Sequence, residues 1–86
     1  MTSLYNGSTA HDAYLRAEAA AAHAGELAAR ILPSATNNRR IVIAFAEAAE
    51  RSRQVAGDHY RSNNPAAAEA AADLAVGAAS ALDRLE

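Results

Sequence analysis

The histidine best placed to bind a metal ion is His23, which lies three residues before Glu26. Metal sites in helical bundles place Glu and His at this spacing, on two helices that face one core. His23, however, falls in the same helical column as Arg16 and Arg30, seven residues to either side. Two neighbouring cations repel a metal dication. We therefore predict no metal site and no cofactor here.

The remaining polar residues lack the arrangements that enzymes use. The chain has no cysteine, no glycine-rich phosphate loop and no serine in a nucleophile elbow, and its other histidines have no partner at ligand spacing. The carboxylates of the middle segment pair more simply with arginines, Glu47 with Arg51 and Glu50 with Arg53. We expect a protein that is not an enzyme.

Five of the eight arginines lie in the middle of the chain. Residues 39–61 sum to a charge of +2, whereas residues 1–38 sum to −1 and residues 62–86 to −3. We expect this segment to pair with the acidic last segment, within or between chains, or with an acidic partner protein. The candidate partner-binding residues are Arg39, Arg40, Arg51, Arg53 and Arg61.

The first two of these arginines fall in the first turn of a predicted helix, where a cation opposes the helix dipole and needs a compensating contact. Phosphates of nucleic acid could supply one, so a small DNA-binding regulator that uses the arginine-rich helix is the alternative function. Residues 65–86, which would be the recognition helix of a helix-turn-helix pair, are acidic. Nucleic acid is therefore the less favoured partner.

A second alternative comes from "YLRAE" at residues 14–18, which has tyrosine and glutamate four residues apart. This pattern and the chain length resemble small helical proteins exported by type VII secretion. The resemblance implies a helical partner protein outside the cell. The Trp-x-Gly turn of that family is absent, and Tyr14 equally extends the apolar stripe of the first helix.

Three segments with helical periodicity must position these residues, at about 9–32, 38–61 and 65–85. Each has apolar residues at alternating spacings of four and three, which predicts one buried stripe per helix. The first stripe is Ala13, Ala17, Ala20, Ala24, Leu27 and Ile31. The second is Ile41, Phe45, Ala48, Ser52 and Val55, with Val42, Ala49 and Ala56 beside it, and it reaches His59 if the helix continues that far. The third is Ala67, Ala71, Leu74, Ala78, Ala81 and Leu85, with Ala68, Ala75 and Leu82 beside it and Ala79 facing away.

Punctuation residues separate the segments. Ser8 or Thr9 offers a start signal for the first helix, Pro33 ends it, and Asn64 followed by Pro65 is a strong start signal for the third. The end of the second helix is open between Ala56 and Arg61, because Gly57 either begins a loop or allows another element to approach closely. We expect the helix to continue to about Arg61.

Alanine occupies 26 of the 86 positions. It has the best helix propensity, and a stripe of alanines lets helices pack near the short end of the usual separation of about 8–10 Å. So few large apolar side chains leave a single chain little to bury. We therefore expect one all-α domain over residues 1–86, an up-down-up three-helix bundle or a long helical hairpin plus a third helix, completed by oligomerisation. The predicted self-association residues are Ala67, Ala71, Leu74, Ala78, Leu82 and Leu85.

The composition also bears on origin and compartment. All eight basic residues are arginine, which together with the alanine content is typical of a high-GC bacterium or its phage. The N-terminus lacks the basic and apolar regions of a signal peptide, and no stretch of 18 apolar residues occurs. We expect a cytoplasmic, non-catalytic interaction or scaffolding module that forms a homodimer, with a protein partner and no membrane association.

Overall fold

A computed structural model describes the backbone of residues 2–86 and the side chains of residues 9–86. It contains α1 (Thr2–Ile31), a short 3-10 helix η1 (Leu32–Ser34), α2 (Arg39–Arg61) and α3 (Pro65–Leu85). The described part of the chain has no strand. The expected all-α, three-helix architecture is confirmed.

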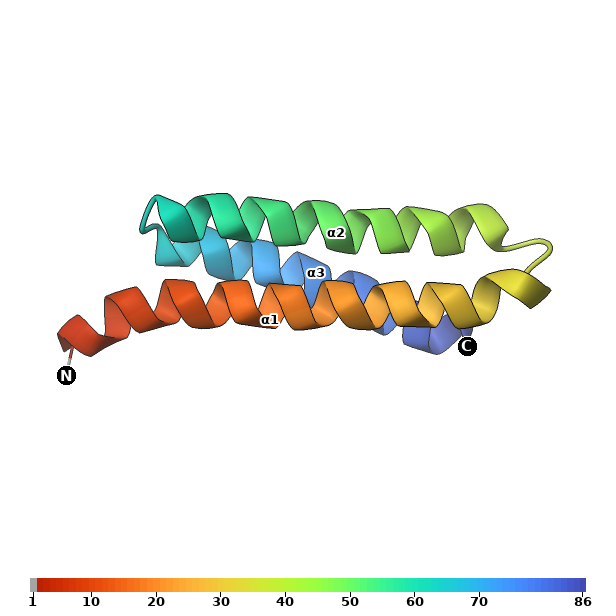
Figure 1. Ribbon diagram of the computed structural model, residues 1–86, viewed down its shortest axis with the longest axis horizontal. Coiled ribbons are helices and arrows are strands. Elements are labelled where there is room, and N and C mark those ends of the chain that lie inside the picture. The colour runs from red at the N-terminus through yellow and green to blue at the C-terminus, as the bar shows by residue number, and fades with distance from the viewer. Residues whose placement is uncertain (1) are drawn as a thin grey trace.

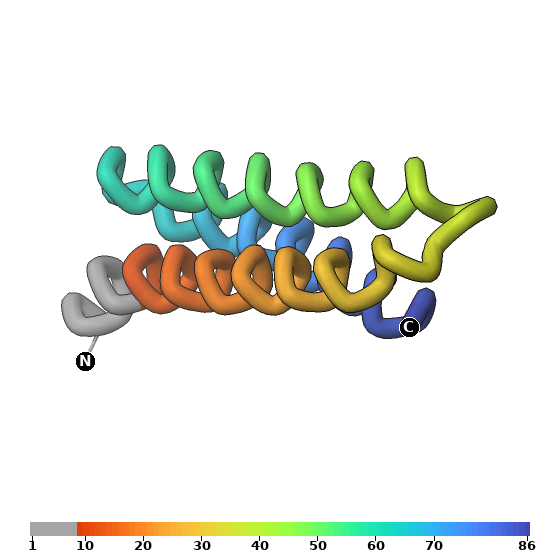
Figure 2. The backbone as a smooth tube through the Cα atoms, turned by 45° about the vertical axis from the view of Figure 1, so that its right-hand side comes forward, coloured from red at the N-terminus to blue at the C-terminus, as the bar shows by residue number. Residues whose placement is uncertain are grey.

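The three long helices lie side by side and run up, down and up, so that α1 and α3 are parallel and α2 is antiparallel to both (Figure 1). Every pair of these helices is in contact. The turned view shows α3 beneath the seam of the other two rather than at the end of a row (Figure 2). The result is an elongated bundle of 49 × 18 × 14 Å.

The core side of α1 is the stripe expected from the sequence. All six predicted stripe residues are buried, and Ala10 and Ala28 join them. The helix begins earlier than expected, at Thr2, and passes through the proposed start signal at Ser8 and Thr9. Serine and threonine are only slightly poorer helix formers than most residues, so they do not by themselves start a helix. The Ser8 side chain lies outside the described residues.

The core side of α2 differs from the expected one by a rotation of about one residue. The buried residues are Val42, Ala49, Ala56 and Gly57. Ile41 and Val55, both predicted to be buried, are exposed. Phe45 packs against the core and is only partly buried. The predicted stripe therefore lies at the edge of the contact with α3.

The same correction applies to α3. Its most deeply buried residues are Ala68, Ala72, Ala75 and Leu82, and Leu74 is 67% exposed. Ala78 is buried as expected, but so is Ala79, which was expected to face away. The interior between closely packed helices has room for methyl groups, so the larger side chains of these two stripes lie outside it.

The helix boundaries follow the punctuation of the sequence. Asn64 is the N-cap of α3, its Oδ1 accepts a hydrogen bond from the Ala67 N–H at 3.3 Å, and Pro65 is the first helical residue. Asn63, just before it, has φ = 56°, a left-handed conformation that asparagine tolerates better than most residues. The α2 helix continues through Gly57 to Arg61, as expected.

Candidate protein-interaction face

The first arginine of α2 compensates a helix end. Arg39 Nη1 donates a hydrogen bond to the backbone carbonyl of Leu32 at 3.3 Å, in the 3-10 turn that follows α1. This carbonyl also accepts the Ala35 N–H at 3.1 Å, and the partial negative charge at a helix end attracts a cation. Arg39 therefore stabilises the α1–α2 connection, a role that its position in the first turn of α2 did not reveal.

Two further arginines are paired with carboxylates of their own helix. Arg53 binds Glu50 through two hydrogen bonds, Nε to Oε1 at 3.0 Å and Nη2 to Oε2 at 2.5 Å. The hydrogen bond from Arg53 lowers the pKa of Glu50 below its ordinary value. Arg61 donates to Asp58 at 2.5 Å. The predicted Glu50–Arg53 pair is confirmed.

The other two arginines, Arg40 and Arg51, are exposed and have no hydrogen-bond or ion-pair partner within residues 9–86. The predicted pair of Glu47 with Arg51 is not formed. At about 100° per residue the five arginines fall within an arc of about 160° of α2, and Glu47, Glu50 and Asp58 fall in the same arc. They do not make a continuous basic surface.

Asp73, Asp83 and Glu86 pair with α1, so the expected pairing of the acidic last segment with α2 is wrong within the chain, while pairing between chains stays a prediction. Arg16 Nη1 lies 2.8 Å from Asp73 Oδ1, and Arg30 Nε lies 2.8 Å from Glu86 Oε2. Between them, His23 Nε2 is 3.3 Å from both carboxylate oxygens of Asp83. The column of residues 16, 23 and 30 is thus one side of an ion-pair ladder between two parallel helices.

The positions of His23 and Glu26 do not form a metal site. The histidine ring contacts α3, and Glu26 is exposed without a partner in the described residues. No group of three His, Cys, Asp or Glu side chains that could hold a metal ion occurs within residues 9–86. No helix in the described part of the chain has the length and hydropathy needed to cross a membrane.

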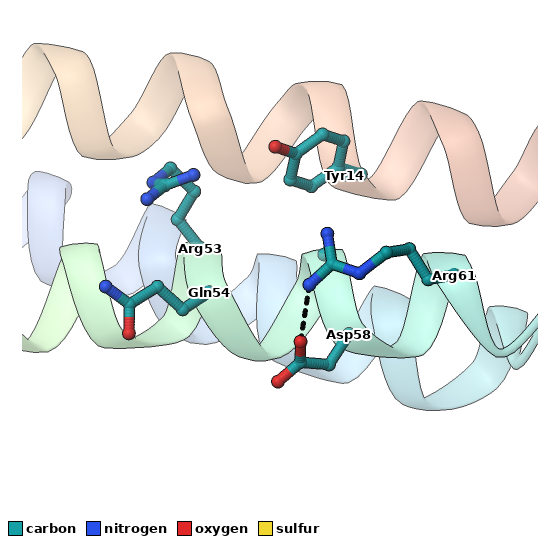
Figure 3. A pocket seen from close by; sticks show the side chains of 6 residues that line it. Tyr14, Arg53, Gln54, Asp58 and Arg61 are labelled. Atoms are coloured by element: carbon teal, nitrogen blue, oxygen red, sulfur yellow. Dashed lines mark hydrogen bonds and ion pairs between the residues drawn. The ribbon is translucent and has the colours of Figure 1, made fainter.

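A polar pocket of about 300 Å³ lies between α1 and α2, lined by Tyr14, Arg53, Gln54, Gly57, Asp58 and Arg61. Figure 3 shows Arg53 reaching from α2 toward α1 beside the Tyr14 ring, and Arg61 lying along α2 with its guanidinium below that ring, where it binds Asp58. Tyr14 stacks on Tyr60 with ring centres 5.6 Å apart and an angle of 11° between the rings. The tyrosine of "YLRAE" therefore packs within the bundle.

Large apolar side chains are exposed on the other side of α2, along its seam with α3. A groove of about 410 Å³ lies there, lined by Phe45, Ala48, Arg51, Ser52, Asp73, Leu74, Gly77 and Ala78. Ile41 and Val55 continue the line of Phe45, Ala48 and Ser52 along α2 at the same helical spacing and are 48% and 43% exposed. We call Ile41, Phe45, Ala48, Val55 and Leu74 the α2–α3 face.

The six predicted self-association residues fall into two groups. Ala71, Ala78 and Leu82 are buried in the bundle, and Leu82 is completely so; that residue is therefore unavailable to a second chain. Ala67 and Leu85 are partly exposed, and Leu74 is the most exposed large apolar residue of the described chain. Three of the six residues thus lie in the interior of the bundle, and the other three are accessible on the surface of α3.

The fold and this face define a small helical bundle with an unpartnered apolar surface. Comparison with known proteins adds nothing to that description, since no family model, curated protein or solved structure matches the chain.

Proposed function

We propose that this chain is a non-catalytic protein-interaction module that associates with itself through the α2–α3 face. The observation that carries the proposal is Leu74, which is 67% exposed beside an apolar groove. Single exposed apolar residues are common on monomers, but a contiguous line of them along two helices is typical of a protein interface. A second copy of the chain would then cover this face and bury the apolar area that a single alanine-rich chain leaves exposed.

The module would serve as a scaffold in the cytoplasm of a high-GC bacterium or its phage. The alanine and arginine bias supports that origin. Arg40 and Arg51 lie exposed next to the α2–α3 face, and they are the arginines available to acidic groups of a chain that covers this side of α2. The other three partner-binding candidates have contacts within the chain.

Sedimentation equilibrium and thermal melting test self-association. We expect a dimer, with a melting temperature that rises with protein concentration because folding and assembly are linked. Leu74→Gln removes an apolar contact from the face and should shift the equilibrium toward monomer. The matched control is Leu15→Gln, which changes a leucine that is 46% exposed on α1, away from the face. A monomer at about 100 μM with a concentration-independent melt would contradict the proposal.

A gel-shift experiment separates this function from DNA binding. A regulator that uses α2 would shift duplex DNA, and the shift would weaken steeply as salt rises. We expect no shift at physiological salt, because Glu47, Glu50 and Asp58 lie among the arginines of α2 and three of the arginines have partners. Salt-sensitive binding that disappears in the Arg40→Ala, Arg51→Ala variant would favour the regulator instead.

A further inference from the structure

We infer that two copies of the chain pair through antiparallel α2 helices, around a twofold axis that passes next to Ala48. This arrangement presupposes the self-association proposed above and specifies its geometry. It draws on two independent patterns on the outer side of α2, one apolar and one charged. Both patterns are symmetric about nearly the same point of the helix.

The apolar pattern is Ile41, Ala44, Ala48 and Val55, all at least partly exposed. Their spacing of three, four and seven residues places them on one side of α2. Ile41 and Val55 are each seven residues, about 10 Å, from Ala48 in opposite directions. In an antiparallel pair centred on Ala48, Ile41 of each copy therefore meets Val55 of the other. The small residues between them let the two helix axes approach closely.

The charged pattern lies along the adjacent ridge of α2. Its residues are Arg40, Glu47, Arg51 and Asp58, so the signs alternate along the chain. In the antiparallel pair, Glu47 of one copy lies near Arg51 of the other, and Arg40 lies near Asp58. A parallel pair would instead place each residue opposite its own equivalent, with like charges facing. The charge order therefore favours one orientation.

Three of these charged residues have no partner within residues 9–86, which agrees with their contacting a second copy. Glu47 and Arg51 have the spacing of an intrahelical ion pair, yet they do not form one, and both are exposed. Arg40 is likewise without a partner in the described residues. A second copy would supply opposite charges to all three. Leu74, at the other rim of the groove, would then cover the flank of the second copy's α2.

Charge reversal in mixed samples tests whether these residues face one another. Glu47→Arg alone and Arg51→Glu alone each create two like-charge contacts in a homodimer. The dissociation constant of each should rise by about 3- to 30-fold. An equimolar mixture restores opposite charges in the heterodimer and should return the dissociation constant to within about 3-fold of the unmodified protein. Failure of the mixture to recover would overturn the inference.

Cysteine cross-linking tests the orientation, because the chain has no cysteine of its own. Oxidation of an equimolar mixture of Ile41→Cys and Val55→Cys should yield the mixed disulfide. Each variant alone should not cross-link, because its two thiols would be about 20 Å apart, far beyond disulfide reach. An Ile41–Ile41 type of cross-link would show a parallel pair and refute the inference.

The outcomes separate the two proposals. If the unmodified chain is dimeric but neither the charge mixture nor the cysteine mixture behaves as expected, another surface mediates the dimer and only the α2 geometry is wrong. If the unmodified chain is monomeric over the whole concentration range, both proposals fail. The substituted positions are exposed and lie outside the core, so the variants should remain folded; circular dichroism verifies that they do.

Discussion

The ring of Tyr14 lies directly against Gly57, so that a β-carbon on residue 57 would be 3.1 Å from Tyr14 Cε1. This glycine is buried in the middle of the contact between α1 and α2. The stacking of Tyr14 on Tyr60 holds the ring in place. A larger residue at position 57 would therefore need the Tyr14 ring to shift by a few tenths of an ångström, so this glycine gives α1 and α2 room to approach even though it weakens α2.

We predict that Gly57→Ala will not give the stabilisation that alanine normally brings to a helix. The matched control is Gly25→Ala in α1, where an added β-carbon would have nothing within 4 Å. That substitution should raise the free energy of unfolding by about 1 kcal/mol. At residue 57 the clash with Tyr14 should cancel the gain or reverse it. Chemical denaturation measures both; equal stabilisation at the two sites would show that Tyr14 moves freely.

Leucine at Ala78 and at Ala79 should be destabilising at both positions. Both alanines are buried, Ala79 with only 5% of its surface exposed. A larger side chain must push a neighbouring helix outward or adopt a strained rotamer, at a cost of about 1–3 kcal/mol. Ala22→Leu, on the exposed side of α1, is the control and should be nearly neutral. Tolerance of leucine at all three sites would mean that close packing does not require the alanines.

The ion pair between Arg16 and Asp73 should contribute little to stability. Both side chains are largely exposed, and such pairs are worth about 0.2–1 kcal/mol and are screened by salt. A double-mutant cycle with Arg16→Ala and Asp73→Ala should give a coupling energy in that range, falling as salt rises. A coupling well above it, unchanged in 1 M salt, would assign the ladder a larger part in holding α1 against α3.

Replacing the N-cap of α3 should cost more than replacing its neighbour in the turn. Asn64→Ala removes the hydrogen bond to the Ala67 N–H and should lower the free energy of unfolding by about 1 kcal/mol, whereas Asn64→Ser should retain most of it. Asn63→Gly should be close to neutral, because glycine accepts the positive φ of that residue. Thermal melts of the three variants at one concentration measure the order.

The helices and their order could be predicted from the sequence because each has helical periodicity and because Pro33, Asn64 and Pro65 mark the breaks between them, whereas the start of α1 could not. The rotation of α2 and α3 could not. A large apolar residue usually marks the core, but here Leu74 is exposed and its neighbour Ala75 is completely buried. When most of a helix is alanine, nearly every rotation is apolar, so a single exposed leucine does not fix which side packs; α3 buries Leu82 and several alanines and leaves Leu74 outside.

The charges show the same limit. The column of Arg16, His23 and Arg30 is visible in the spacing alone. Which residues of α3 face this column depends on the rotation of α3 about its axis. The packing of the alanine residues in the core sets that rotation. The α2–α3 face was similarly present in the sequence, as two stripes that were expected to be interior. The residue types showed that these stripes are apolar, and only the packing showed that they are exposed.

The three-residue link between α2 and α3 has a consequence for how the bundle assembles during folding. Closing this short hairpin costs little chain entropy, whereas the Arg16–Asp73 and Arg30–Glu86 contacts join residues 57 and 56 positions apart. The contacts between α1 and α3 should therefore form late in folding. Substitutions of Arg16 or Asp73 would then mainly speed unfolding and change the refolding rate little.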